Sequence, residues 1–144
     1  MILIDAGPMV ALISASDNHH ESCRATLETI AEPLATVWPA FTEAMYLLRS
    51  SRPAQRALWG MIERGTIEII YLSIDDARRM RELMDKYRDL PMDLADAALV
   101  HTAEREKIHR IFTLDRRDFS VYRPVGVGRF SILPAKLREN LVRR

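Results

Sequence analysis

Met1-Ile2-Leu3-Ile4-Asp5 opens the chain, and this stretch decides the fold. An apolar run this short predicts a strand buried on both faces, as in a parallel sheet. Asp5 is then expected at the carboxyl edge of that sheet, where open α/β folds bind their ligands. A carboxylate at this place either caps the helix that follows or belongs to a site, and the five residues alone leave both interpretations open.

Short strands alternate with helices along the rest of the chain. This alternation predicts a single α/β domain whose parallel sheet is covered by helices on both faces. Residues 136–144 are expected to form a basic C-terminal tail. The expected strands are 1–4, 34–37, 66–72, 110–114 and 129–133, and the expected helices are 8–16, 19–32, 38–50, 52–65, 73–88 and 93–103.

Composition is typical of a soluble globular protein. The chain has 144 residues, 48% of them hydrophobic, and a mean hydropathy of −0.12, enough for one domain with a sizeable core. The single cysteine, Cys23, cannot form an internal disulfide, which favours a reducing compartment. No apolar run is long enough to cross a bilayer, and the amino terminus lacks the basic region of a signal peptide. We therefore expect a cytoplasmic protein without a membrane partner.

The net charge of +1 hides an uneven distribution. Setting aside six acids that the next paragraphs bring together leaves fourteen acids against twenty-one Lys and Arg, a surface of about +7. Most of these cations are arginines, which suit bidentate phosphate contacts, although a compositional bias of the source genome explains them equally well. The six acids are Asp5, Glu43, Asp93, Asp96, Asp115 and Asp118.

Asp115 repeats the pattern of Asp5, because the apolar run Ile111-Phe112-Thr113-Leu114 ends in it. If the two strands are neighbours, their terminal carboxylates lie within one interstrand spacing, roughly 5 Å. Either acid alone is more often a cap or a turn former. The coincidence of two such strand ends favours a site.

The other four acids have competing interpretations. Glu43 lies in a nearly all-apolar helix, so it is either a buried acid that coordinates something or an acid at an exposed position of the first turn. Asp93 fits a helix N-cap, whereas Asp96, three residues on, is flanked by small apolar residues that indicate close packing. Asp118 is either a turn acid or an accessory group.

Carboxylates that converge on one pocket cannot all stay ionised without a cation. Ligands that are all oxygens suit Mg²⁺ or Mn²⁺ rather than zinc, and paired divalent ions are a common device for phosphodiester cleavage. The sequence contains no Gly-rich phosphate loop and no Cys/His metal spacing, and its serines and Cys23 lack an identifiable base. The chemistry indicated is that of carboxylates and a metal.

In its motifs the chain resembles the PIN-domain family, and specifically the VapC-type ribonuclease toxins of type II toxin–antitoxin systems. Besides the first strand, the resemblance rests on Trp38-Pro39-Ala40-Phe41-Thr42-Glu43-Ala44, Met92-Asp93-Leu94-Ala95-Asp96-Ala97-Ala98 and Phe112-Thr113-Leu114-Asp115-Arg116-Arg117-Asp118-Phe119. Each motif alone is weak, but their order and spacing are specific.

This resemblance implies a three-layer α/β/α PIN-like domain, here residues 1–135, with a central and mainly parallel sheet. It also implies Mg²⁺- or Mn²⁺-dependent cleavage of RNA, homodimerisation, and inhibition by a cognate antitoxin whose chain fills the groove. The catalytic and metal-binding acids that it implies are Asp5, Glu43, Asp96 and Asp115, with Asp93 and Asp118 as possible accessory ligands. Arg116, Arg117 and Arg123 are expected phosphate contacts beside the pocket, with a solvated surface role as the alternative.

Three other functions compete with this one. A phosphatase could use Asp5 as its nucleophile, but such sites usually have a second acid two residues on, where this chain has Gly7. A non-catalytic binding module could dock a basic partner peptide in the acidic pocket. A structure-specific DNA nuclease is disfavoured by the small size of the chain and its lack of inserted loops.

Overall fold

The computed structural model describes residues 1–135, and within them one five-stranded sheet forms the centre. The strand order is β3-β2-β1-β4-β5, and every neighbouring pair is parallel. The first stretch of the sequence is thus the central strand, as the prediction of burial on both faces requires. All five expected strands form: β1 (Ile2–Ile4), β2 (Leu34–Thr36), β3 (Ile67–Ile69), β4 (Arg110–Phe112) and β5 (Ser131–Leu133).

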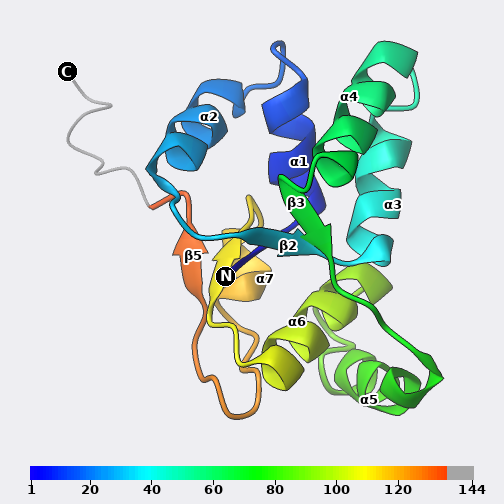
Figure 1. The fold of residues 1–144 in the computed structure, drawn as a ribbon. Coiled ribbons are helices and arrows are strands. Elements are labelled where there is room, and N and C mark those ends of the chain that lie inside the picture. The colour runs from blue at the N-terminus through cyan, green and yellow to red at the C-terminus, as the bar shows by residue number, and fades with distance from the viewer. Residues whose placement is uncertain (136–144) are drawn as a thin grey trace.

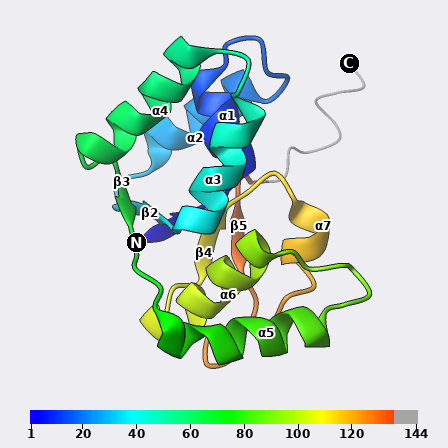
Figure 2. The same ribbon diagram turned by 90° about the vertical axis from the view of Figure 1, so that its right-hand side faces the viewer.

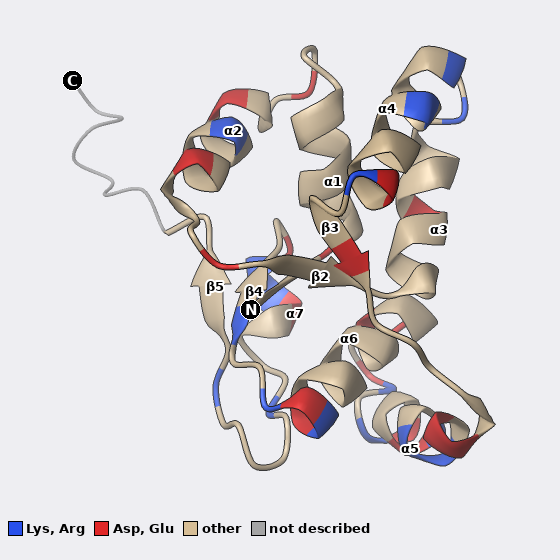
Figure 3. Ribbon diagram, in the orientation of Figure 1, with Lys and Arg blue, Asp and Glu red and all other residues tan. Residues whose placement is uncertain are grey.

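Helices cover both faces of this sheet, which confirms the three-layer α/β/α prediction (Figures 1 and 2). The first four helices lie on one side, and η1, α5 and α6 lie on the other. Both acidic and basic residues lie along α5, the outermost of these helices (Figure 3). The helices are α1 (Ala6–Ile13), α2 (His20–Thr29), α3 (Trp38–Leu47), α4 (Arg52–Glu63), the 3₁₀ turn η1 (Ile74–Asp76), α5 (Ala77–Lys86), α6 (Leu94–Glu106) and α7 (Arg116–Phe119).

Two stretches differ from the sequence-based expectation near the carboxyl edge. Helix α1 begins at Ala6 rather than Pro8, because the Asp5 side chain caps it by accepting a hydrogen bond from the Ala6 N–H. The expected strand 110–114 ends at Phe112, and the chain then enters the short helix α7, which the sequence analysis did not predict. Asp115 is the N-cap of α7. The expected basic tail, 136–144, lies outside the described residues.

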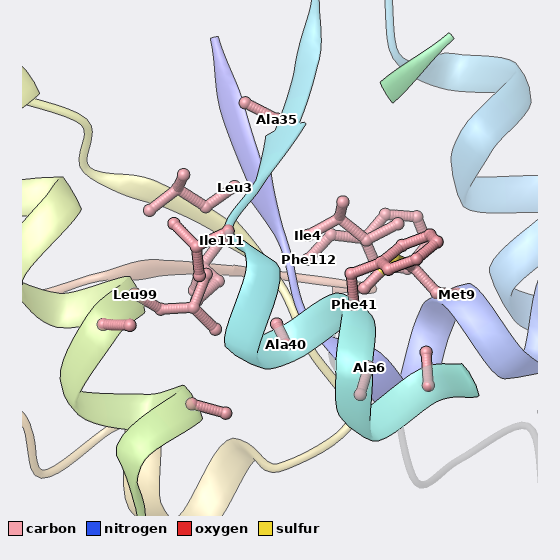
Figure 4. Close-up of a cluster of buried hydrophobic side chains, with 14 of the residues drawn as sticks. Leu3, Ile4, Ala6, Met9, Ala35, Ala40, Phe41, Leu99, Ile111 and Phe112 are labelled. Atoms are coloured by element: carbon pink, nitrogen blue, oxygen red, sulfur yellow. The ribbon is translucent and has the colours of Figure 1, made fainter. Parts of the chain in front are cut away.

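The core fills the space on both sides of the central strands (Figure 4). Successive residues of a strand point to opposite faces, so β1 contributes Leu3 to one layer and Ile4 to the other. Leu3 lies on the side of Leu99 of α6, while Ile4 lies on the side of Met9 of α1 and Phe41 of α3. All five of these residues are at most 3% exposed. The central strand is therefore fixed from both sides, and Asp5 at its end is held with it.

Among residues 1–135, no helix has both the length and the apolar character that crossing a membrane requires.

Candidate active site

All six acids singled out in the sequence line one cavity of about 500 Å³ at the carboxyl edge of the sheet. Parallel strands and the helices that follow them bring the acids together from β1, α3, α6 and α7. No Lys, Arg or His of residues 1–135 is among the side chains that line this cavity. Its walls are Asp5, Ala6, Gly7, Glu43, Leu47, Pro91, Asp93, Asp96, Leu114, Asp115 and Asp118.

Asp5 is both a helix cap and a wall of the cavity, so the two interpretations of the opening stretch hold together. It is 8% exposed. One carboxylate oxygen, Oδ1, accepts a hydrogen bond from the Ala6 N–H at 2.8 Å, and the other, Oδ2, accepts one from Thr113 Oγ1 at 2.9 Å. Burial raises the pKa of Asp5 from its usual range, and these two hydrogen bonds oppose the shift. The carboxyl is therefore held in one orientation.

Asp96 enters the cavity from the first turn of α6. The side chain of Asp93, the N-cap of this helix, accepts a hydrogen bond from the Asp96 N–H at 2.9 Å, as the cap prediction for Asp93 required. The buried hydroxyl of Tyr122 donates to Asp96 Oδ2 at 2.7 Å. Burial, with smaller contributions from Asp93, Asp5 and Asp115, raises the pKa of Asp96 to about 8 against the effect of that hydrogen bond.

The tightest group of ligand atoms comes from Asp96, Asp115 and Asp118, each of which offers an oxygen within 4.8 Å of the others. Asp115 Oδ1 accepts a hydrogen bond from the Asp118 N–H at 3.2 Å, so the short helix α7 fixes the two acids relative to each other. Burial, followed by the charge of Asp115, raises the pKa of Asp118. A hard divalent cation prefers such an oxygen-only donor set, and it would relieve the mutual repulsion of the acids.

Glu43 faces the cavity from α3, and its side chain is exposed, so the alternative of a buried glutamate is wrong. The alternative of an exposed position is correct, but Glu43 lies in the second turn of α3 rather than in the first. Partial burial first, and then the charges of Asp5, Asp93 and Asp115, raise its pKa. Glu43 thus belongs to the same electrostatic group as the other acids and is the most accessible to solvent on the α3 side.

The structure separates the three arginines that were expected to contact phosphate. The guanidinium of Arg116 donates to Pro134 O at 2.6 Å, and that of Arg123 donates to the carbonyls that end α7, with Ser120 O at 2.6 Å. Arg117 is exposed, and its guanidinium makes no hydrogen bond or ion pair with the rest of the described chain. Arg117 is therefore the free cation beside the acids among these three.

Two residues that orient the acids escaped the sequence analysis. Thr113 follows β4 directly and takes the place next to Asp5 that Asp115 was expected to occupy. Tyr122 is fully buried and packs edge-to-face on Phe119 and Tyr87, with ring centroids 5.1 and 5.0 Å away. A buried tyrosine needs a partner for its hydroxyl, but nothing in the sequence indicates that the partner is Asp96.

Comparison with known proteins identifies the family of the chain. The model of the PIN domain family matches residues 2–123. Ribonuclease VapC26 of Mycobacterium tuberculosis is 30% identical over 135 residues, which are 92% of this chain and 100% of the relative.

Two solved structures share the fold. The crystal structure of VapC20 of Mycobacterium tuberculosis, described as a sarcin-ricin loop cleaving toxin, superimposes with a TM-score of 0.75 at 15% identity, covering 81% of this chain and 92% of that one. A toxin–antitoxin complex from Klebsiella pneumoniae gives a TM-score of 0.65 at 23% identity, covering 84% of this chain and 92% of the other.

Proposed function

Because this chain belongs to the PIN-domain family, we propose that it is a divalent-metal-dependent endoribonuclease, the toxin of a toxin–antitoxin pair. One observation carries the proposal: six carboxylates line a cavity to which residues 1–135 contribute no cationic side chain. Such an arrangement is costly for the fold unless a cation completes it. The similarity to a ribonuclease over nearly the whole chain supports RNA as the substrate.

The acids of the cavity fit Mg²⁺ or Mn²⁺. Asp5, Asp96 and Asp115 are the proposed direct ligands. Asp118 is close enough to Asp96 and Asp115 to take part, whereas Asp5 lines the same cavity outside this close group of three, and Asp93 is the proposed outer group. When bound, the cation supplies a lowered pKa for the attacking water and charge stabilisation at the phosphate.

The residues of this chain then have separate tasks. Glu43, exposed at the cavity wall and with a raised pKa, orients the attacking water and accepts its proton. Thr113 and the Ala6 N–H hold the Asp5 carboxylate, and Tyr122 holds that of Asp96, so that the remaining lone pairs point into the cavity. Arg117 is the proposed contact for an RNA phosphate.

An antitoxin is the proposed protein partner. The solved complex that shares this fold contains a toxin with its antitoxin, which supports a partner of that kind here. A basic side chain of the antitoxin that enters the cavity would neutralise the same acids that a metal neutralises, and would thereby inhibit the enzyme. A homodimer, a cytoplasmic location and a domain boundary at residue 135 are further parts of the proposal.

RNA cleavage by the purified full chain tests the function. We expect cleavage of cellular RNA with Mg²⁺ or Mn²⁺ and none with EDTA. Asp96→Asn is expected to abolish cleavage while thermal stability is kept or raised, because burial and the neighbouring acids disfavour an ionised carboxylate at this position and an amide carries no charge at any pH. Full activity of Asp96→Asn would contradict the metal site. A protein that cleaves no RNA and gains no stability from divalent ions would instead be a docking module for a basic peptide.

A further inference from the structure

Tyr46 and Arg49 form a stacked pair at the end of α3. The guanidinium of Arg49 lies over the Tyr46 ring, 4.0 Å from its centroid, and its Nη1 donates to Tyr46 O at 3.0 Å. That hydrogen bond fixes the guanidinium against the ring. Tyr46 is nevertheless 61% exposed. A large ring is therefore held in a defined position and left open to solvent.

The pair lies next to the acid cavity. Glu43 and Leu47, four residues apart on α3, both line that cavity. Tyr46 is three residues after Glu43 and directly before Leu47, so it lies about one helical turn, roughly 5 Å, from Glu43 along the helix axis. A molecule that extends from the cavity along the end of α3 meets Tyr46 first and then Arg49.

The other aromatic side chains of this region serve the fold. Trp38, Phe41 and Trp59 contact one another across α3 and α4, with ring centroids 4.7 to 6.1 Å apart. Among the described residues, Tyr46 has no aromatic neighbour of this kind, and its one stacking partner is a cation. An exposed ring that is backed by a guanidinium offers a π-face for a nucleobase and a positive charge for the adjoining phosphate.

We propose that Tyr46, supported by Arg49, stacks on a nucleobase of single-stranded RNA next to the phosphodiester that is held at the acid cavity. The inference rests on the proposed ribonuclease function and adds a substrate-binding residue to it. Stacking accepts every base, because every base has a π-face, so Tyr46 contributes to affinity and to the position of the strand rather than to base selectivity. The phosphate charge favours RNA over a neutral protein surface as the partner of this Tyr–Arg pair.

RNA binding measured by fluorescence anisotropy tests this directly. The probe is a short fluorescein-labelled single-stranded RNA of randomised sequence, with Mg²⁺ present and every protein in the Asp96→Asn background so that the strand stays intact. Tyr46→Ala is expected to raise the Kd for this RNA about tenfold, whereas Tyr46→Phe is expected to keep the original Kd. An RNA with abasic nucleotides has no base to stack, so it is expected to bind equally well to the protein with Tyr46 and to the Tyr46→Ala variant. Tyr71→Ala is the matched control, since Tyr71 is 79% exposed and does not line the acid cavity.

Cleavage kinetics in the otherwise unchanged protein add a second readout. Tyr46→Ala is expected to raise KM and to keep kcat within about twofold, because stacking binds the RNA equally in the ground state and in the transition state. Unchanged RNA affinity in Tyr46→Ala, or an equal loss in Tyr71→Ala, overturns the inference even where the protein cleaves RNA. A change of oligomeric state in Tyr46→Ala without a change in RNA affinity overturns it in favour of a protein contact. Absence of cleavage by the wild type counts against the proposed function, and the binding comparison still decides the role of Tyr46.

Discussion

Asp76 and Asp96 are the same residue type at the same burial, 7% and 8% exposed, and their chemistry is opposite. Asp76 lies in η1 and contacts the middle and end of α6: His101 Nε2 is 2.6 Å and Arg105 Nη1 3.1 Å from its Oδ1. These contacts, led by His101 and followed by the Ser73 N–H, lower the pKa of Asp76 to about 2. Asp96, at the start of the same helix, has a pKa raised to about 8.

Both side chains are hidden from solvent, but burial is the main cause of the raised pKa of Asp96, whereas at Asp76 the hydrogen bonds from His101 and the Ser73 N–H outweigh the effect of burial. Around Asp76, acids and cations are paired: Arg79 forms a two-pronged contact with Glu104, with both N···O distances 2.8 Å, and Glu104 also accepts from the Val125 N–H. Figure 3 shows both charges along α5 and at the adjoining end of α6. At the other end of α6, the neighbours of Asp96 across the cavity are acids. At one end of α6 the acids thus have cationic partners within the protein, whereas at the other end the proposed function assigns them a bound cation.

Of the substitutions, removing the acid that His101 and Arg105 of α6 contact should cause the largest loss of stability. Asp76→Asn is expected to lower the free energy of unfolding by about 3 kcal/mol, because it removes the buried anion that His101 and Arg105 contact. Urea denaturation measures this. Asp75→Asn, the exposed neighbour in the same turn, is the control and should change stability by less than about 0.5 kcal/mol. Equal losses in the two variants would contradict the pairing account.

The second prediction concerns pH: the contributions of Asp96 and Asp76 to stability should depend on pH in opposite directions. In an unfolded chain the pKa of aspartate is about 3.9, so between pH 5 and pH 8 folded Asp96 retains a proton that the unfolded chain has lost. Its contribution is therefore present at low pH and is lost as pH rises through about 8. Asp76 behaves oppositely: its contribution is present above the unfolded pKa and is lost as pH falls towards about 2.

In EDTA, the wild type is accordingly expected to lose about 4 kcal/mol more than Asp96→Asn between pH 5 and pH 8. Urea denaturation of both proteins at each pH measures the difference, and the contributions of groups that do not interact with Asp96 cancel in the comparison. A wild type that gains stability relative to Asp96→Asn over this range would show that Asp96 has a cationic partner.

Removing the hydroxyl that holds Asp96 should have a smaller effect, concentrated on activity. Tyr122→Phe is expected to lower metal-dependent RNA cleavage about tenfold, the usual result of losing a hydrogen bond that orients a metal ligand. Tyr87→Phe is the matched control, because the hydroxyl of Tyr87 accepts from the Arg123 N–H and touches no carboxylate of the cavity. We expect the two variants to lose similar amounts of stability and only Tyr122→Phe to lose activity.

The two ends of α6 also differ in how far sequence alone could predict them. The carboxyl edge was predictable because strand ends and helix starts carry local signals: apolar runs ending in Asp5 and near Asp115, and the cap pattern at Asp93. The sheet then brings such positions to one edge regardless of the side chains between them. The cavity-lining position of the six acids followed from that rule. The order of the strands did not, since the sequence left open whether the strands that lead to Asp5 and Asp115 are neighbours.

Side-chain contacts between residues far apart in the sequence have no such local signal. The sequence gives no sign of the role of His101, since its partner Asp76 is 25 residues away on another helical element. Thr113 and Tyr122 became visible as supports of Asp5 and Asp96 only in three dimensions, because their contacts span 108 and 26 residues. Helix α7 was missed because four residues are too few for a hydrophobic period to appear.

The central claim is that the acid cavity is a divalent cation site, and thermal unfolding with and without Mn²⁺ at pH 8 tests it most directly. An ion that binds only the folded protein stabilises it. At a free Mn²⁺ concentration a hundredfold above the Kd, the unfolding free energy of the wild type should rise by about 3 kcal/mol. The account predicts this gain in the wild type and in Asp76→Asn, and its loss in Asp96→Asn. A wild type that gains nothing from Mn²⁺, or an Asp96→Asn variant that gains as much, would contradict it.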